Sequence, residues 1–203
     1  MAFAIQTRGL SGYRELLQSM PQQTRQAARL AINTSARRGR AEGSRRIREQ
    51  VNLTASYLNL PGRFQVSRFA TTQEPTAVIS ARTEPTSLAR FATQRSRGGK
   101  RAGLRIGIKR AGGKTVLRSG FFINLRSGNR GVAVRTAVAD RLNLRRAGIV
   151  GRASKRGYML LYGPSVDQVF RTVRQDMLPQ LSAFTNAEFL RQFSRLSQSG
   201  RRR

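Results

Sequence analysis

The feature that most constrains this chain is its charge. Its 203 residues include 39 Lys and Arg but only 9 Asp and Glu, which gives a formal net charge of +30 at pH 7. Self-repulsion on this scale opposes a compact state unless polyanions or acidic protein surfaces neutralise it. We therefore expect a protein that works in contact with an anionic partner. Nucleic acid, acidic protein and anionic lipid are the candidates.

The residues that the sequence lacks exclude most familiar kinds of catalytic site. The chain has no Cys and no His, so disulfides, thiolate metal sites and the usual general base are absent. Asp140, Asp167 and Asp176 are scattered along the chain, and we interpret them as ion-pair partners rather than as catalytic carboxylates. The sequence thus predicts a protein that is not an enzyme and that has neither a catalytic residue, a cofactor nor a metal site.

One stretch comes close to a nucleotide-binding loop. Gly112, Gly113, Lys114 and Thr115 resemble its end, but Ile108 stands where the motif needs its first glycine. The surrounding residues favour a β-hairpin over the strand, loop and helix of such a site. We interpret the stretch as a flexible basic turn.

The distribution of apolar residues predicts a folded protein without a membrane span. Residues 116–125 and 166–193 are apolar enough to form a core, and 38% of the chain is hydrophobic. No stretch reaches the roughly 18 to 20 apolar residues of a span, and residues 1–5 are too short for a signal sequence. We expect one domain over residues 1–203, made in the cytoplasm, with basic arms and no membrane partner.

Helical periodicity is found near both ends of the chain. Leu10, Tyr13, Leu16 and Leu17 predict a short amphipathic helix, and Ser19 with Pro21 resembles the start of a second, longer one. From about residue 22 to residue 50 a narrow stripe of small or apolar residues predicts a helix that packs closely on a neighbour: Ala28, Ala31, Ile32, Ser35, Gly39, Gly43 and Ile47. Arg38 with Glu42 and Arg45 with Glu49 are spaced as helical ion pairs.

The clearest helix is the last one. Ser165 and Gln168 form a capping-box pattern, and apolar residues then recur every three or four positions: Val166, Val169, Phe170, Val173, Met177, Leu181 and Phe184. Pro179 is expected to kink or divide this amphipathic helix. Beyond it, an apolar face is expected to extend towards the tail at residues 201–203 through Phe189, Leu190, Phe193 and Leu196.

The middle of the chain predicts strands and hairpins. Residues 75–81 read as a strand, and residues 104–108 and 115–117 as a hairpin joined by residues 110–114. Residues 120–125 and 132–136 predict a second hairpin, and residues 158–162 a further strand that ends at Gly163 and Pro164. The predicted fold class is α+β, with a long N-terminal helix, a small antiparallel sheet of hairpins, and a C-terminal helix kinked at Pro179.

Basic residues gather in segments free of acids. These are a loop or arm at residues 95–118, a stretch at 141–156 and a tail at 197–203. Arginine fits phosphate or carboxylate groups bidentately, although GC-rich coding would also enrich it. The residues expected to contact nucleic acid or an acidic partner are Arg95, Arg97, Lys100, Arg101, Arg105, Lys109, Arg110, Lys114, Arg145, Arg146, Arg201, Arg202 and Arg203.

Arginines also stand beside phenylalanines, in Arg63-Phe64, Arg68-Phe69 and Arg90-Phe91. A surface that stacks single-stranded bases would use such pairs. Core phenylalanines flanked by exposed arginines are the simpler interpretation.

Several segments, and their order, resemble the minor tail protein Z family of lambda-like long-tailed phages. They are residues 28–33 (Ala-Arg-Leu-Ala-Ile-Asn), the strand at 120–125, Gly163-Pro164-Ser165 and Leu178-Pro179; the likeness covers roughly residues 27–59 and 120–196. It implies a tail completion subunit in a ring, hexameric by our expectation, at the head-proximal end of the virion tail. Such a subunit would contact other tail or neck proteins and the end of the double-stranded DNA, and would reach the virion from the host cytoplasm. The family implies no catalytic residues.

DNA alone does not account for the charge of such a ring. A globule of 203 residues is about 40 Å across, and duplex DNA of that length carries about 24 phosphates. Six copies would carry a charge of about +180, so most of it must face something else. Acidic ring neighbours, a tape-measure protein, or DNA reached by flexible arms are the alternatives. A ribosomal or other RNA-binding protein would explain the charge equally well, while a membrane-surface protein fits less well because basic and apolar stretches are largely separate.

Overall fold

The computed structural model describes residues 21–94, 103–139 and 149–200. The chain divides into two compact units. The first consists of Met1–Arg46, Leu58–Arg82 and Phe170–Arg203, and the second of Ile47–Tyr57 and Thr83–Val169. Each unit is described by itself. The α+β class is confirmed, whereas the single domain stays a prediction. The expected helix within residues 1–20 lies outside the described residues.

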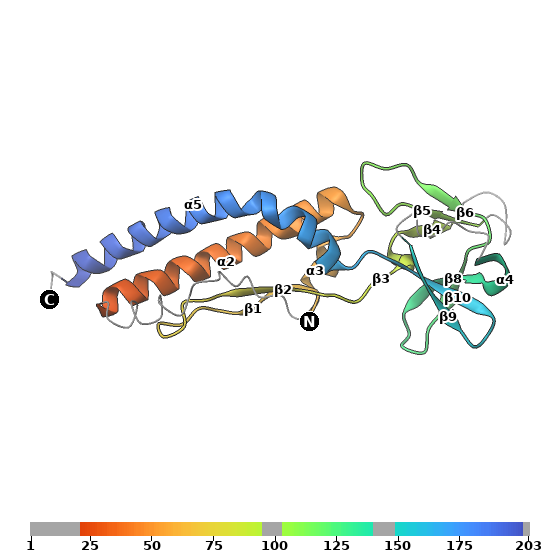
Figure 1. Ribbon diagram of the computed structural model, residues 1–203, viewed down its shortest axis with the longest axis horizontal. Helices are drawn as coiled ribbons and strands as arrows, with labels where there is room; N and C mark the ends of the chain where they lie inside the picture. Colours follow the sequence, from red (N-terminus) through yellow and green to blue (C-terminus); the bar gives the residue numbers. More distant parts are fainter. Residues whose placement is uncertain (1–20, 95–102, 140–148, 201–203) are drawn as a thin grey trace. The chain divides into compact units, whose positions relative to one another are not determined.

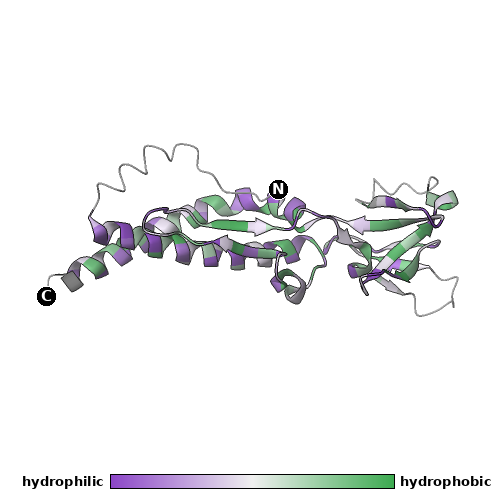
Figure 2. Ribbon diagram, turned by 90° about the horizontal axis from the view of Figure 1, so that it is seen from below, coloured by the Kyte–Doolittle hydropathy of each residue, from purple (hydrophilic) through white to green (hydrophobic). Residues whose placement is uncertain are grey.

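Two long helices and one hairpin build the first unit (Figure 1). Helix α2 (Gln22–Gln50) has the predicted bounds, and helix α5 (Val166–Gly200) lies alongside it. Small residues line the inner side of α2: Ala27, Ala31, Ser35, Gly39 and Gly43 are buried. An ideal Cβ on Gly39 would lie 3.0 Å from Leu181 on α5, so the absence of a side chain allows the close approach that the stripe predicted. Apolar and polar residues alternate along both helices in Figure 2, as expected of helices that bury one side.

A β-hairpin packs against α2 in this unit. Strand β1 (Phe64–Arg68) pairs antiparallel with β2 (Val78–Ala81), which lies within the predicted strand at 75–81. Phe64 is fully buried, and its ring meets that of Phe170 edge-on with centroids 4.8 Å apart. Asn33 of α2 binds the backbone beyond β1, since its amide nitrogen donates to Ala70 O at 3.0 Å and its oxygen accepts from Ala70 N at 2.7 Å.

Helix α5 begins at the predicted capping box. Ser165 Oγ accepts from Gln168 N at 3.0 Å, and Gln168 Oε1 accepts from Ser165 N at 2.9 Å. Two orphan amides at the helix start are thereby satisfied. The helix runs through Pro179 undivided, so the division considered for this residue does not occur.

The apolar face predicted for the second half of α5 is present only in part. In the second half of the helix Glu188 and Gln192 are buried, with 6% and 7% exposure, whereas Leu190 is 63% and Phe193 38% exposed. Residues 181, 188 and 192 follow the helical repeat of the inner side, while residues 190 and 193 fall on another side. Phe189 and Leu196, the other two residues of the predicted face, are half-buried, so the prediction holds for two of its four residues.

Two antiparallel sheets and several short helices build the second unit. Its main sheet has the strand order β3 (Thr86–Ser87), β10 (Tyr158–Gly163), β8 (Arg130–Arg135) and β7 (Phe121–Asn124), with β9 (Val150–Ser154) also paired to β10. A second sheet has the order β4 (Ala92–Gln94), β5 (Leu104–Ile106) and β6 (Thr115–Leu117). The short helices are α3 (Ala55–Asn59), whose first three residues belong to this unit, the 3-10 helix η1 (Leu88–Arg90) and α4 (Thr136–Ala139).

One face of the main sheet forms the core of this unit. Val132, Val134, Leu161 and Thr86 are at most 1% exposed, together with Leu88 of η1. Gly163 lies against the ring of Phe91, where an ideal Cβ would stand 2.8 Å from Cε2. Strands β7, β8 and β10 confirm the predicted strands at 120–125, 132–136 and 158–162. Strand β9 was not predicted, because it lies in the basic stretch at 141–156 and lacks a run of apolar residues.

Candidate polyanion interface

Four of the thirteen predicted contact residues lie in the described part of the chain. Arg105, Lys109, Arg110 and Lys114 all belong to the segment from β5 to β6, and all are exposed. We call residues 104–117 the basic hairpin. The others lie outside the described residues: Arg95, Arg97, Lys100, Arg101, Arg145, Arg146, Arg201, Arg202 and Arg203.

The strands of the basic hairpin are short and its connection is long. Leu104, Arg105 and Ile106 pair with Leu117, Val116 and Thr115, so residues 107–114 form the connection, which is longer than the predicted turn at 110–114. Leu104, Ile106 and Leu117 are buried, and Arg105 points to the opposite, exposed side. Because residues 107–114 join two antiparallel strands, they do not form the strand, loop and helix of a nucleotide-binding loop.

The connection is held at its base by the last turn of α2 and by the chain that follows it. Asn52 N donates to Ile108 O at 2.9 Å, and the Asn52 side chain donates to Gly107 O at 2.9 Å and to Lys109 O at 3.3 Å. Arg110 N donates to Gln50 O at 3.0 Å, and its guanidinium donates to Arg48 O at 3.2 Å. The cations are therefore presented from an anchored loop rather than from a free arm.

This arrangement suits a phosphate backbone. The basic hairpin contains Arg105, Lys109, Arg110 and Lys114 and no acidic residue. Cations at fixed positions on an exposed loop bind a regularly spaced polyanion without losing the entropy of ordering a long arm. The hairpin can thus position a polyanion, and its residues offer no chemistry on it.

Many arginines elsewhere contact aromatic rings. Arg37 lies over Phe69 at 5.0 Å, Arg38 over Phe184 at 4.2 Å and Arg90 over Tyr57 at 4.8 Å from the guanidinium carbon to the ring centroid. The predicted partner of Arg38, Glu42, accepts hydrogen bonds from Arg45 and Arg46. Such cation–π contacts stabilise the arginine side chains of a protein that has few carboxylates to pair with them.

The three Arg-Phe dipeptides were interpreted either as a base-stacking surface or as core phenylalanines beside exposed arginines, and they do not all fit one interpretation. Phe64 and Phe91 are core residues with 0% and 5% exposure, as the simpler interpretation predicted. Phe69 is 44% exposed and carries the guanidinium of Arg37, so it is not a core residue.

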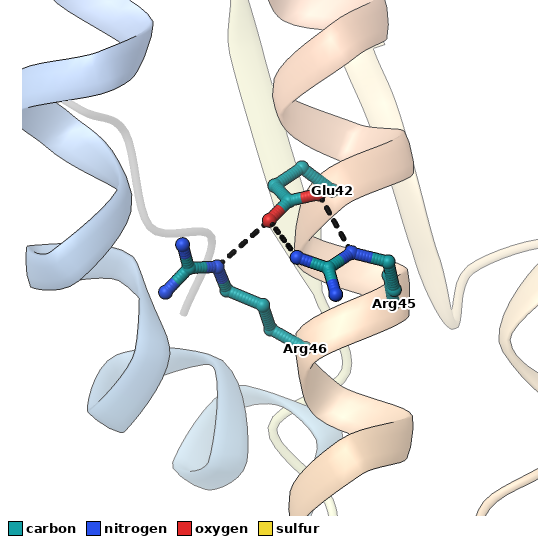
Figure 3. Close-up of polar contacts among 3 residues, drawn as sticks. All are labelled: Glu42, Arg45 and Arg46. Atoms are coloured by element: carbon teal, nitrogen blue, oxygen red, sulfur yellow. Dashed lines mark hydrogen bonds and ion pairs between the residues drawn. The ribbon is translucent and has the colours of Figure 1, made fainter.

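Glu42 and Glu188 each accept hydrogen bonds from arginine on their own helix. Glu42 accepts from Arg45 at 2.6 and 2.9 Å and from Arg46 at 2.8 Å (Figure 3). The hydrogen bonds from Arg45 and Arg46 lower the pKa of Glu42 from 4.5 to about 2. Hydrogen bonds from Arg191 and Gln192 likewise lower the pKa of Glu188 to about 2. Both carboxylates are structural partners of arginine, and their low pKa values do not suit general acid catalysis at neutral pH.

A second feature of the second unit was missed at the sequence level. The strand register brings Phe121, Tyr158 and Tyr162 to one face of the main sheet, with Arg135 and Arg152 beside them. The sequence signal for this face was the spacing of Tyr158, Leu160 and Tyr162, which stand two apart and therefore lie on one side of a strand. The positions of Phe121 and Arg152 depend on which strands pair, which the sequence pattern did not give.

No protein family model, curated protein or solved structure matches this chain. Across residues 21–94, 103–139 and 149–200, no helix is long and apolar enough to cross a membrane. In that same part of the chain, no three acidic side chains gather as a metal site would require.

Proposed function

We propose that this chain is a structural virion protein, a tail completion subunit of a long-tailed phage. In this proposal it forms a ring at the head-proximal end of the tail, where it contacts neighbouring tail proteins and the end of the double-stranded DNA. The single observation that carries the proposal is the charge. Even if each acidic residue neutralised one cation, thirty positive charges would remain, and part of them is presented on the anchored basic hairpin.

Two further observations support the proposal. The long helices near both ends and the hairpins between them agree with the α+β subunit that the resemblance to the minor tail protein Z family implies. The exposed apolar side chains Leu178, Leu190 and Phe193 on α5 offer surface for neighbours in an assembly. An RNA-binding protein would share the charge but would need no ring.

The test is to image the purified full chain by negative-stain microscopy, alone and with short duplex DNA, at low ionic strength. We expect rings of uniform diameter and a DNA affinity whose logarithm falls linearly with the logarithm of salt concentration. A monomer that binds structured RNA tightly would instead support the RNA-binding alternative. A monomer indifferent to DNA, RNA and acidic proteins would overturn both.

A further inference from the structure

The main sheet of the second unit has two very different faces. Residues directly paired in an antiparallel sheet lie on the same face, as do residues two apart along a strand. Val132, Val134 and Leu161 belong to the buried face. Phe121 pairs with Ala133, Ala133 with Leu160, and Leu160 with Arg152, so these residues share the other face with Tyr158, Tyr162 and Arg135.

At its middle this other face is buried, since Ala133 is 0% exposed and Gly131 is buried too. Around them it is aromatic, whereas a sheet face open to solvent is normally polar. Phe121, Tyr158 and Tyr162 are each half-buried, and Leu160 and Ile123 lie between them over Gly131, 3.4 and 3.5 Å from its Cβ position. From strand geometry the two tyrosines stand about 13 Å apart along β10, and Phe121 about 10 Å away across β8. We call Phe121, Tyr158 and Tyr162, with Arg135 and Arg152, the aromatic face. The three rings are partly exposed and the two arginines are exposed, so both kinds of side chain can reach a partner.

Cations flank the rings. The guanidinium of Arg135 is 6.0 Å from the ring centroid of Phe121, and that of Arg152 is 5.9 Å from that of Tyr162. Both distances are at the outer limit of a cation–π contact, so either side chain can turn to a phosphate at little cost. The five strands of the sheet contain no acidic residue. The positive charge of this sheet therefore favours a polyanion as the partner over a protein surface that has no acidic residues.

Duplex DNA does not match this surface, because its bases are stacked inside the helix and its exposed backbone gains nothing from aromatic rings. A single strand does match, since each base has a π-face that stacks on a ring while the neighbouring phosphates meet arginine. From this combination we infer that the aromatic face binds single-stranded DNA by base stacking. The choice of DNA over RNA rests on the proposed function, whereas the stacking itself rests on the rings and arginines.

The test compares two double variants of the full chain. Tyr158→Leu with Tyr162→Leu keeps apolar volume but removes both rings, and Tyr158→Phe with Tyr162→Phe keeps the rings. Affinity for fluorescently labelled oligo(dT) is measured across a salt series, and circular dichroism confirms the fold. We expect the Leu variant to lose about tenfold in affinity per ring with its salt slope unchanged, and the Phe variant to bind as the wild type does.

Further variants separate stacking from charge. Arg135→Gln with Arg152→Gln is expected to lower the salt slope for oligo(dT) by about 1.4, or 0.7 per phosphate contact. Phe69→Leu, which removes an exposed ring with its own arginine in the first unit, is the matched control and should leave oligo(dT) affinity unchanged. Duplex binding should be the same in the wild type and the Leu variant.

Each other result overturns the inference. Wild-type affinity for oligo(dT) in the folded Leu variant would refute stacking on this face. An altered oligomeric state of that variant with unchanged oligo(dT) affinity would assign the face to a protein contact. Tighter binding of oligo(U) than of oligo(dT), lost in the Leu variant, would refute DNA as the ligand and count against the proposed function too. Intact rings that fail to bind oligo(dT) would refute the inference while leaving the proposed function standing.

Discussion

Gly43 lies so close to Phe64 that an ideal Cβ on the glycine would stand 2.9 Å from Cζ of the ring, and 3.0 Å from Cε2 of Phe170. Two aromatic rings that contact each other edge-on thus occupy the space a side chain would take. Position 43 is where helix α2 meets both the hairpin and helix α5 of the first unit.

Gly43→Ala is therefore expected to destabilise the protein. Overpacking costs typically about 1 to 3 kcal/mol, partly offset by about 1 kcal/mol of gained helix propensity. Gly39→Ala is the matched control, because its new methyl group meets mainly the flexible tip of Leu181 at 3.0 Å. Urea unfolding should show a clearly larger loss for position 43 than for position 39. Equal effects would contradict the packing described for the two rings.

A second prediction concerns the start of α5. Gln168→Ala removes the acceptor for Ser165 N, which belongs to a residue only 1% exposed, and should lower the unfolding free energy by about 1 kcal/mol. Gln168→Glu keeps the acceptor and places a negative charge at the helix N-terminus, so it should retain the wild-type stability. Thermal unfolding of the two variants checks this, and equal losses in both would rule out the capping box as the cause.

The capping box shows what the sequence could predict. Local patterns determine it, and the bounds of α2, the small stripe at Gly39 and Gly43, and strands β7, β8 and β10 follow from similarly local periodicity. The exposed basic residues of the hairpin were likewise predictable, because they cluster in a segment of the sequence without acidic residues.

What the sequence did not predict depends on contacts between distant segments. The anchoring of residues 107–109 by Asn52 joins positions more than fifty residues apart. The aromatic face arises only from the order of strands in the sheet. The burial of Glu188 and Gln192 departs from the expectation that apolar residues face inward, and here hydrogen bonds between Glu188, Arg191 and Gln192 satisfy the carboxylate.

The low pKa of Glu188 predicts acid sensitivity with a definite sign. Its pKa is about 2 in the folded protein and its ordinary value is 4.5, so the folded state favours the ionised form. The resulting stabilisation is fully present above about pH 4.5 and is lost as the pH falls towards 2. Glu188→Gln should therefore flatten the dependence of unfolding free energy on pH in this window. Glu42 titrates in the same window, so the double variant with Glu42→Gln should be flatter still.

Asp176→Asn provides the control for this experiment. It removes one negative charge from an exposed position on the same helix, so it reproduces the change in net charge. Its unfolding free energy, measured over the same pH range, is the reference for judging the flattening in Glu188→Gln. A flattening as large as that of Glu188→Gln would mean that net charge, and not the contact with Arg191, sets the acid sensitivity.

The basic tail gives a prediction that depends only on its sequence. Removing Arg201, Arg202 and Arg203 takes away three adjacent cations. We expect weaker duplex DNA binding and a smaller salt slope with an unchanged thermal unfolding midpoint, measured by fluorescence anisotropy and calorimetry. A salt slope equal to that of the full chain would exclude a DNA contact by the tail.

The basic hairpin gives the sharpest prediction for duplex binding. Lys109→Gln with Lys114→Gln removes two exposed cations, and the backbone of residue 109 keeps its bonds to residues 51 and 52. If both ammonium groups contact phosphates, the slope of log affinity against log salt should fall by about 1.8, or 0.9 per contact. Arg171→Gln with Arg174→Gln removes the same charge from α5 in the first unit and should change the slope much less. Equal slopes for the two double variants would show that duplex DNA responds to net charge alone, and the hairpin would then have no specific part in binding it.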